Sequence, residues 1–323
     1  MLSKTESLIV PSEIYIPGDF LKTPEELPTQ PDLYRTLMVE PGSRVSLGDI
    51  DTNYYGPHQS YERTITSIGA YVQRINQLQY LMHAEGKHSL LIVLQGLDAG
   101  GKDGVVRPLL SSMNPAGCRI AAFKQPTAIE LSHDFLWRVH PHVPAKGEVT
   151  VFNRSHYEDV LFARVHQVVP MAVWLARYAL INDFERLLAQ SNDTTIVKFF
   201  LHISKDEQLA RFKRRLDDPS RQWKISESDY TEREYWDDYV AAFEDMLRRT
   251  STWHAPWFIV PSDNRWFRDL AISQVITRTL EDLDMKLPET VVDIGQIRQR
   301  HHAVELLEGG SADAHFAPGA NPE

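Results

Sequence analysis

The feature that most constrains the fold is the stretch 91–104, in which a short apolar run ends in a glycine-rich turn. The run of Leu, Ile and Val predicts a buried strand, and the residues after the turn predict a helix start. Between them, Gly96, four residues, Gly101 and Lys102 have the spacing of a phosphate-binding loop. In such a loop glycines let backbone N–H groups surround a phosphate, and the helix adds the positive end of its dipole. The stretch therefore predicts a phosphate site, with a plain strand-to-helix turn as the alternative.

Two carboxylates distinguish this loop from the usual pattern. Asp98 lies inside the loop, and Asp103 stands where a Mg²⁺-binding Ser or Thr normally follows the lysine. A carboxylate repels phosphate unless a metal ion or a lysine lies between them. We therefore expect Asp98 to hold Mg²⁺ or to act in catalysis, and Lys102 to face solvent while the loop is empty. The other residues of the loop expected to contact phosphate or nucleotide are Gly96, Ala99, Gly100, Gly101, Asp103 and Gly104.

The composition of the 323 residues limits the classes of partner. Net charge is −10 and the pI is near 5.7, which argues against broad binding to nucleic acid or to an anionic membrane. Cys118 is the only cysteine, so neither an intrachain disulfide nor a cysteine metal cluster is expected. The first residues lack the order of a signal peptide, and no apolar run has the length of a bilayer span. We expect a cytoplasmic protein.

Strand-like and helix-like segments alternate along the chain. Expected strands are 91–95, 120–123, 149–152, 195–203 and 257–260, and expected helices are 65–85, 103–113, 129–140, a helical region up to about 190, and 229–250. This alternation predicts a three-layer α/β fold on a parallel five-stranded sheet, with ligands at the carboxyl ends of the strands. We expect an extended or disordered arm over 1–34, one domain over 35–288, and a largely disordered extension over 289–323 with a short helix at 297–307.

A second group of polar residues follows the third expected strand. Arg154 has the planar fork that clamps phosphate oxygens, and Glu158 and Asp159 are candidate Mg²⁺ ligands. The alternative is a helix start whose first turn carries acidic residues that favour the helix dipole. Both interpretations can hold together, because a helix start at a strand end also binds anions.

A third group is basic and follows the fourth expected strand. Ser204 and Glu207 predict a capped helix, whose residues Leu209, Phe212 and Leu216 are expected to face the core. The cations expected to bind phosphate here are Arg211, Lys213, Arg215 and Lys224. They oppose the acidic balance of the chain, which favours a phosphate-binding lid over about 205–230 rather than a solvated charged helix. The aromatic residues of 229–250 are expected to be core.

Taken together, these motifs resemble the polyphosphate kinase 2 family. The resemblance runs from about residue 41 to 288 and rests on the segments 96–104, 132–138 (Ser-His-Asp-Phe-Leu-Trp-Arg), 152–160 (Phe-Asn-Arg-Ser-His-Tyr-Glu-Asp-Val), 223–224 and 255–257. It implies a P-loop kinase fold with a helical lid, and transfer of phosphoryl groups between inorganic polyphosphate and nucleotides. It also implies Mg²⁺, with Mn²⁺ as a substitute, and a homo-oligomer, dimer or tetramer.

By this match Asp98, Lys102 and Arg154 are the expected catalytic residues. The segments 39–49 and 152–155 look most like the branch that phosphorylates both AMP and ADP. Two alternatives remain open: an ATP-dependent kinase of nucleotides or small metabolites, and a nucleotide-binding regulatory module without turnover.

Overall fold

The computed structural model describes residues 31–56, 61–111 and 113–312. Its centre is one parallel sheet of five strands in the order β2-β3-β1-β4-β5. The strands are β1 (Ser89–Gln95), β2 (Cys118–Ala122), β3 (Val149–Asn153), β4 (Thr194–His202) and β5 (Trp257–Pro261). β1, which leads into the glycine-rich turn, lies in the middle of the sheet. The predicted five-stranded parallel sheet is confirmed.

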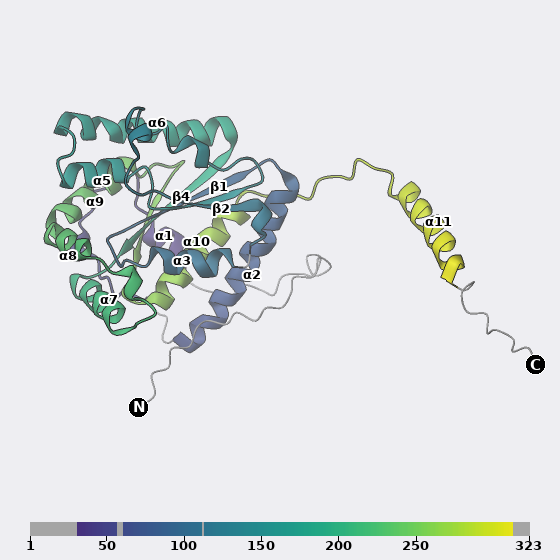
Figure 1. Ribbon diagram of the computed structural model, residues 1–323, viewed down its shortest axis with the longest axis horizontal. Coiled ribbons are helices and arrows are strands. Elements are labelled where there is room, and N and C mark those ends of the chain that lie inside the picture. The colour runs from purple at the N-terminus through teal and green to yellow at the C-terminus, as the bar shows by residue number, and fades with distance from the viewer. Residues whose placement is uncertain (1–30, 57–60, 112, 313–323) are drawn as a thin grey trace, which may run out of the picture. The chain divides into compact units, whose positions relative to one another are not determined.

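Helices cover both faces of the sheet and give three layers (Figure 1). One face carries α1 (Leu33–Leu37), α2 (Tyr61–Glu85), α3 (Lys102–Leu110) and α10 (Arg265–Glu281). The other face carries α5 (Glu158–Val165), α6 (Met171–Asn192) and α9 (Trp236–Thr250). The three-layer α/β fold is therefore confirmed.

The central strand shows why an uninterrupted apolar run was needed. Every residue of β1 is buried, and successive side chains enter opposite layers. Leu90, Ile92 and Leu94 pack with α2, α3 and α10, whereas Leu91 and Val93 pack with α5, α6 and α9. A strand buried on both faces has no position for a polar side chain until it ends, so the polar loop begins at the edge of the sheet.

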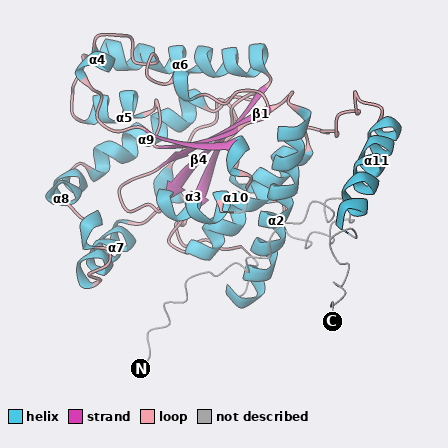
Figure 2. Cartoon of the chain, turned by 45° about the vertical axis from the view of Figure 1, so that its right-hand side comes forward, coloured by secondary structure: helices cyan, strands magenta, loops and turns pink. Residues whose placement is uncertain are grey.

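The lid segment is helical, as the resemblance implied. It consists of α7 (Lys205–Asp217), η5 (Gln222–Lys224) and α8 (Glu227–Glu234). Figure 2 shows α7 and α8 on the side to which the strand arrows point. The Ser204 side chain caps α7 by accepting a hydrogen bond from the Glu207 N–H at 3.0 Å, which is the predicted helix start. The remaining short elements are η2 (Leu47–Asp49), η3 (Pro115–Gly117), α4 (Ala128–Leu131) and η4 (His140–His142).

Three expectations about helices were wrong. The helix expected over 129–140 ends at Leu131, because Ser132 and the turns after it interrupt the period before Pro141. The helix expected over 229–250 is two helices, α8 and α9, separated at Tyr235. Of the three α7 side chains expected in the core, only Phe212 is buried, since Leu209 and Leu216 are each 46% exposed.

The ends of the domain also differ from the expected boundaries. Residues 31–34 do not belong to an arm, because α1 begins at Leu33, a core residue whose N–H donates to Gln274 Oε1 at 2.9 Å. The rest of the expected arm, 1–30, lies outside the described residues. Contacts divide the chain into a main unit that ends at Lys286 and a second unit from Leu287.

The second unit contains more regular structure than expected. Its helix α11 (Ile294–Ala312) extends well beyond the expected 297–307, so an extension that is largely disordered is wrong for this part. Across the described ranges, no helix combines the length and apolar composition that crossing a membrane requires.

Candidate active site

The loop between β1 and α3 has the backbone geometry of a phosphate cradle. Ala99 and Gly101 both have positive φ, at 59° and 105°. A Cβ on Gly101 would collide with the Arg268 guanidinium, so glycine is required there by φ and by space. Because Gly101 is also the N-cap residue of α3, the loop delivers the chain directly into a helix N-terminus. The unpaired N–H groups of that terminus are available to an anion.

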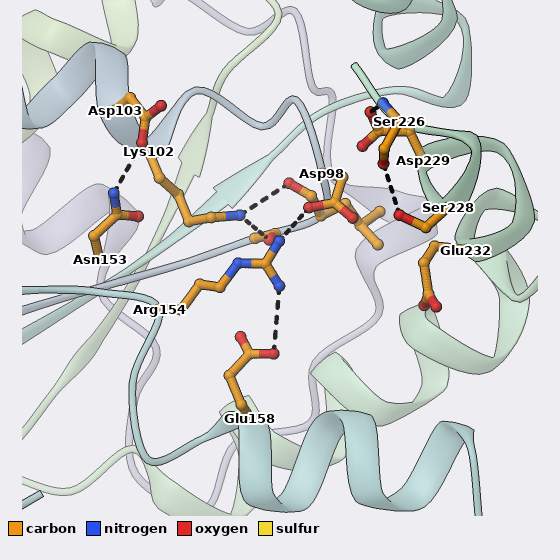
Figure 3. Close-up of polar contacts among 12 residues, drawn as sticks. Asp98, Lys102, Asp103, Asn153, Arg154, Glu158, Ser226, Ser228, Asp229 and Glu232 are labelled. Atoms are coloured by element: carbon orange, nitrogen blue, oxygen red, sulfur yellow. Dashed lines mark hydrogen bonds and ion pairs between the residues drawn. The ribbon is translucent and has the colours of Figure 1, made fainter. Parts of the chain in front are cut away.

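Lys102 is buried rather than facing solvent, contrary to expectation. Its Nζ donates to the carbonyl oxygens of Gly96, at 2.6 Å, and Leu97, at 3.1 Å (Figure 3). Burial and the nearby Arg154 charge lower the pKa of Lys102 from 10.5 to about 8, against the opposing influence of neighbouring carboxylates. The ammonium group therefore contacts the backbone of its own loop. To bind a phosphate, it would have to exchange these carbonyl oxygens for phosphate oxygens.

Arg154, at the start of the turn after β3, lies between two carboxylates. One guanidinium nitrogen, Nη2, donates to Asp98 Oδ1, and the other, Nη1, lies 3.6 Å from Glu158 Oε2 (Figure 3). Burial opposes the charge on Arg154, but Glu158 and Asp98 outweigh it and raise the pKa of the guanidinium. Burial raises the pKa of Glu158, and the Arg154 and Lys102 charges oppose that effect. Asp98 follows β1, whereas Arg154 and Glu158 both follow β3, so the three groups meet because β1 pairs with β3.

Asp103 points away from the loop interior and joins two other elements. It accepts from Asn153 Nδ2 at 2.8 Å and from Lys224 Nζ at 3.2 Å. Burial acts to raise the pKa of Asp103, but these two donors outweigh it and hold the pKa below its usual value. Lys224 belongs to the lid, so Asp103 links the start of α3 to the lid.

Two of the predicted lid cations are held by internal contacts. The Arg211 guanidinium is buried and donates to the carbonyl oxygens of Ala99 and Gly100, both at 2.9 Å, and to that of Ser262. Arg215 donates to the Lys224 carbonyl oxygen at 3.2 Å, within the lid. Arg211 thus stabilises the backbone of the loop through these hydrogen bonds. Its charge is not free to bind a ligand in this structure.

The structure does not bring two predicted site residues to the others. The Asp159 carboxylate accepts from Arg138 Nη2 at 3.0 Å, and its backbone carbonyl accepts from Arg177. Lys213 is exposed and forms an ion pair with Asp217 at 2.8 Å on the outer surface of α7. Asp159 follows Glu158 directly, and Lys213 lies two positions from both Arg211 and Arg215, so the helical rotation turns each side chain away from the site.

A pocket beside the loop includes residues that the sequence did not reveal. Asp98, Arg154 and Glu158 form one side of it. Aromatic and polar side chains from the lid and α9 form the other side, namely Gln208, Glu232, Arg233, Trp236, Tyr239 and Phe243. Glu232 is held in place by Tyr239, whose hydroxyl donates to Oε2 at 2.8 Å, and by His166 Nε2 at 2.9 Å. Periodicity predicted core positions for these aromatic residues. This is confirmed for Phe243, which is buried, while Tyr239 packs against the same core and also lines the pocket.

The arrangement combines a phosphate cradle, two cations and two carboxylates that could hold a divalent cation. The comparisons with known proteins agree with this chemistry. The family model described as Polyphosphate kinase 2 matches residues 59–288. An AMP/ADP-polyphosphate phosphotransferase of Meiothermus ruber is 46% identical over 252 residues, which are 78% of this chain and 94% of that protein.

Two further relatives give the same result. An ADP-polyphosphate phosphotransferase of Rhodopseudomonas palustris is 44% identical over 79% of this chain and 92% of its own length. The crystal structure of polyphosphate kinase 2 from Arthrobacter aurescens superposes with a TM-score of 0.79 at 41% identity, over 84% of this chain and 96% of that one. The chain belongs to the polyphosphate kinase 2 family.

Proposed function

We propose that this protein transfers the terminal phosphoryl group of inorganic polyphosphate to ADP and to AMP, reversibly and with Mg²⁺. The observation that carries the proposal is the cluster at the loop, where Lys102 and Arg154 meet Asp98 and Glu158. Relatives named for AMP/ADP and ADP activity, at 46% and 44% identity, support both acceptors.

The reaction joins two anions, so the protein's task is mainly charge compensation and alignment. The bond between the terminal phosphorus of polyphosphate and its bridging oxygen breaks, and a bond to an oxygen of the nucleotide's terminal phosphate forms. That acceptor oxygen is already ionised at neutral pH, so no general base is required. Lys102 and Arg154 would bind the oxygens of the transferred group, and the lid would exclude water that could otherwise take the phosphoryl group.

The carboxylates fit a magnesium site of the kind that substrate completes. Within the described parts of the chain, no group of three or more His, Cys, Asp and Glu side chains could hold a metal ion. Mg²⁺ is usually bound by one or two carboxylates together with substrate phosphates, and Asp98 and Glu158 supply two. When bound, the ion would neutralise charge on the phosphates. Asp159 is not part of this pair, because it does not line the pocket that Asp98 and Glu158 line and its carboxylate pairs with Arg138.

The pocket beside the loop suits the nucleoside of the acceptor. Trp236 and Tyr239 offer ring surfaces for a base, and Glu232 offers a fixed hydrogen-bond acceptor. These two aromatic residues line the same pocket as Asp98 and Arg154. An AMP or ADP bound there would therefore extend its phosphates toward the loop.

We also propose a homo-oligomer. The exposed apolar side chains of α6, among them Met171 (67% exposed), Leu180 (50%) and Leu187 (51%), form a surface that a second copy could cover. Light scattering of the full chain tests this: a dimer or tetramer is expected, and a monomer at micromolar concentration would contradict it.

The test of the activity is product analysis. The purified protein is mixed with polyphosphate, Mg²⁺ and either AMP or ADP, and the nucleotides are separated by chromatography. ADP and ATP from AMP, and ATP from ADP, are expected, and Asp98→Asn serves as the inactive control. ATP from ADP alone would remove AMP as an acceptor. Transfer from ATP but not from polyphosphate would establish the alternative, an ATP-dependent kinase.

A further inference from the structure

A charged network lies buried beneath the active site, and the mechanism above does not use it. The Lys198 ammonium, in the middle of β4, donates to Glu185 Oε2 at 2.6 Å, to the Tyr157 hydroxyl at 2.8 Å and to the Thr250 carbonyl at 2.7 Å. The side chains of Lys198 and Glu185 are both 0% exposed. Lys198 lies on β4, Glu185 on α6 and Thr250 on α9, and Tyr157 immediately precedes α5. The network therefore connects the helices of one layer to the sheet.

Glu185 is the centre of this network. Its Oε1 accepts from the Tyr157 hydroxyl at 2.8 Å and lies 3.2 Å from His156 Nε2. Burial acts to raise the pKa of Glu185, but Lys198 and His156 outweigh it, so the carboxylate stays ionised. One carboxylate thus holds two consecutive residues of the turn after β3.

That turn begins with Arg154, whose backbone is in a conformation that non-glycine residues seldom adopt. Arg154 has φ of 61°, and such a residue persists only when the structure around it holds it on both sides. On one side, the Arg154 N–H donates to Leu94 O at 3.1 Å. On the other, the Gln95 side-chain oxygen accepts from Ser155 Oγ at 3.0 Å and from the Ser155 N–H at 3.1 Å, and Ser155 Oγ accepts from the Tyr157 N–H at 3.2 Å.

Stability alone does not account for a buried ion pair at this position. Replacing such a pair with apolar residues of similar volume is often neutral or stabilising, so the pair is weak support for a purely stabilising role. This pair is distinguished by the other partners of Glu185. Apart from Lys198, its carboxylate contacts His156 and Tyr157, the two residues that follow Ser155.

We propose that Glu185, held by Lys198, is a positioning residue for Arg154. By holding His156 and Tyr157 in place as a clamp, Glu185 stabilises the turn in which Arg154 has positive φ. That turn then places the Arg154 guanidinium between Asp98 and Glu158. The inference rests on the proposed function, since it assigns Arg154 to the transferred phosphoryl group.

The test uses Tyr157→Phe, which removes one hydroxyl from the clamp, and a matched core variant, Ile276→Val in α10. Displacing a catalytic group by about 1 Å costs on the order of 100-fold in rate, so we expect Tyr157→Phe to lower kcat about tenfold or more. KM for nucleotide and polyphosphate should stay within about twofold, because Arg154 would contact only the transferred phosphoryl group and the other substrate contacts remain. Ile276→Val should leave both constants unchanged although it also destabilises the fold.

The decisive measurement is a double-mutant cycle with Arg154→Ala, followed by single-turnover transfer. If the clamp acts through Arg154, adding Tyr157→Phe to Arg154→Ala lowers the rate no further. A loss of the same size in both backgrounds would overturn the proposal and leave a merely structural network. Failure of the wild-type chain to transfer from polyphosphate would instead refute the proposed function.

A second variant and a crystal structure make the test independent of activity. Glu185→Leu combined with Lys198→Met removes both buried charges together, which avoids leaving one charge unpaired. In its crystal structure we expect Arg154 to leave positive φ or to lose its contact with Asp98. An unchanged Arg154 in that structure would overturn the proposal.

Discussion

Lys102 provides a prediction in which activity and stability change in opposite directions with pH. Its pKa is about 8 in the folded protein and 10.5 when unperturbed. At 1.36 kcal/mol per pH unit, that gap corresponds to about 3.4 kcal/mol, the net amount by which burial and Arg154, opposed by the nearby carboxylates, disfavour the charged form. The unfolded state therefore binds more protons than the folded state between pH 8 and 10.5. The contribution of Lys102 to the free energy of unfolding therefore rises with pH across this window, by about 1.4 kcal/mol per pH unit at most.

Activity should fall in the same window because the neutral amine no longer attracts phosphate. At saturating nucleotide, kcat/KM for polyphosphate reports the enzyme to which polyphosphate has not yet bound, and we expect it to decline about tenfold per pH unit above pH 8. In the complex, phosphate charge raises the pKa of the ammonium, so kcat should hold to higher pH than kcat/KM.

The assay measures kcat/KM from pH 6.5 to 9.5 at saturating nucleotide, and urea unfolding at the same pH values. Other groups also titrate in this pH range. The quantity to compare is therefore the difference in the free energy of unfolding between wild type and Lys102→Met at each pH. That difference should grow in favour of the wild type from pH 8 upward. A flat kcat/KM to pH 9.5, or stability curves for the two proteins that remain parallel, would refute the assignment of a buried lysine with a lowered pKa.

Four further predictions concern other residues of the site. Asp98→Asn should lower kcat on the order of 100-fold or more, as loss of a charge-positioning group does. Asp103→Asn removes only a half-exposed ion pair with Lys224 and should cost less than about fivefold, so equal losses would show that the two acids have the same role. Arg211→Ala should lower the free energy of unfolding by about 3–5 kcal/mol in urea titration, because two loop carbonyls and that of Ser262 lose a buried charged donor; a loss under 1 kcal/mol would contradict this. Trp236→Ala should raise KM for nucleotide about tenfold through lost stacking, and an equal rise in KM for polyphosphate would refute the nucleoside pocket.

The sequence was sufficient to predict the features that follow from local pattern. An apolar run followed by Gly96 and Gly101 requires a buried strand and a turn, and the structure has both. The burial of Lys102 could not be predicted in this way, because it depends on where the carbonyl groups of Gly96 and Leu97 point. The position of the Lys102 side chain depends on the backbone dihedral angles of the loop, and the spacing of glycine and lysine in the sequence does not determine these angles.

Helix faces were predicted less well than helices. Arg211 and Arg215 lie four residues apart on α7, yet one is buried against the loop and the other contacts Lys224 within the lid. The pattern of charges gave them the same role. Only the position of α7 beside β5 separates them, since Ser262, which accepts from Arg211, follows that strand. Tertiary placement decides which cation on a basic helix is free and which is structural.

Every cation that we assign to phosphate binding has a partner within the protein. Arg154 contacts Asp98, Lys102 contacts two carbonyl oxygens, and Lys224 contacts Asp103. Binding of an anion is therefore an exchange, in which phosphate oxygens must replace the existing acceptors. Each exchange alone yields little, since the free energy gained from the new ion pair is offset by the one that is lost. A single phosphate can make one such exchange, whereas a chain of phosphates can make several at once with little further loss of translational freedom. A self-paired site thus discriminates against isolated phosphate and favours a polyanion, which is the donor that we propose.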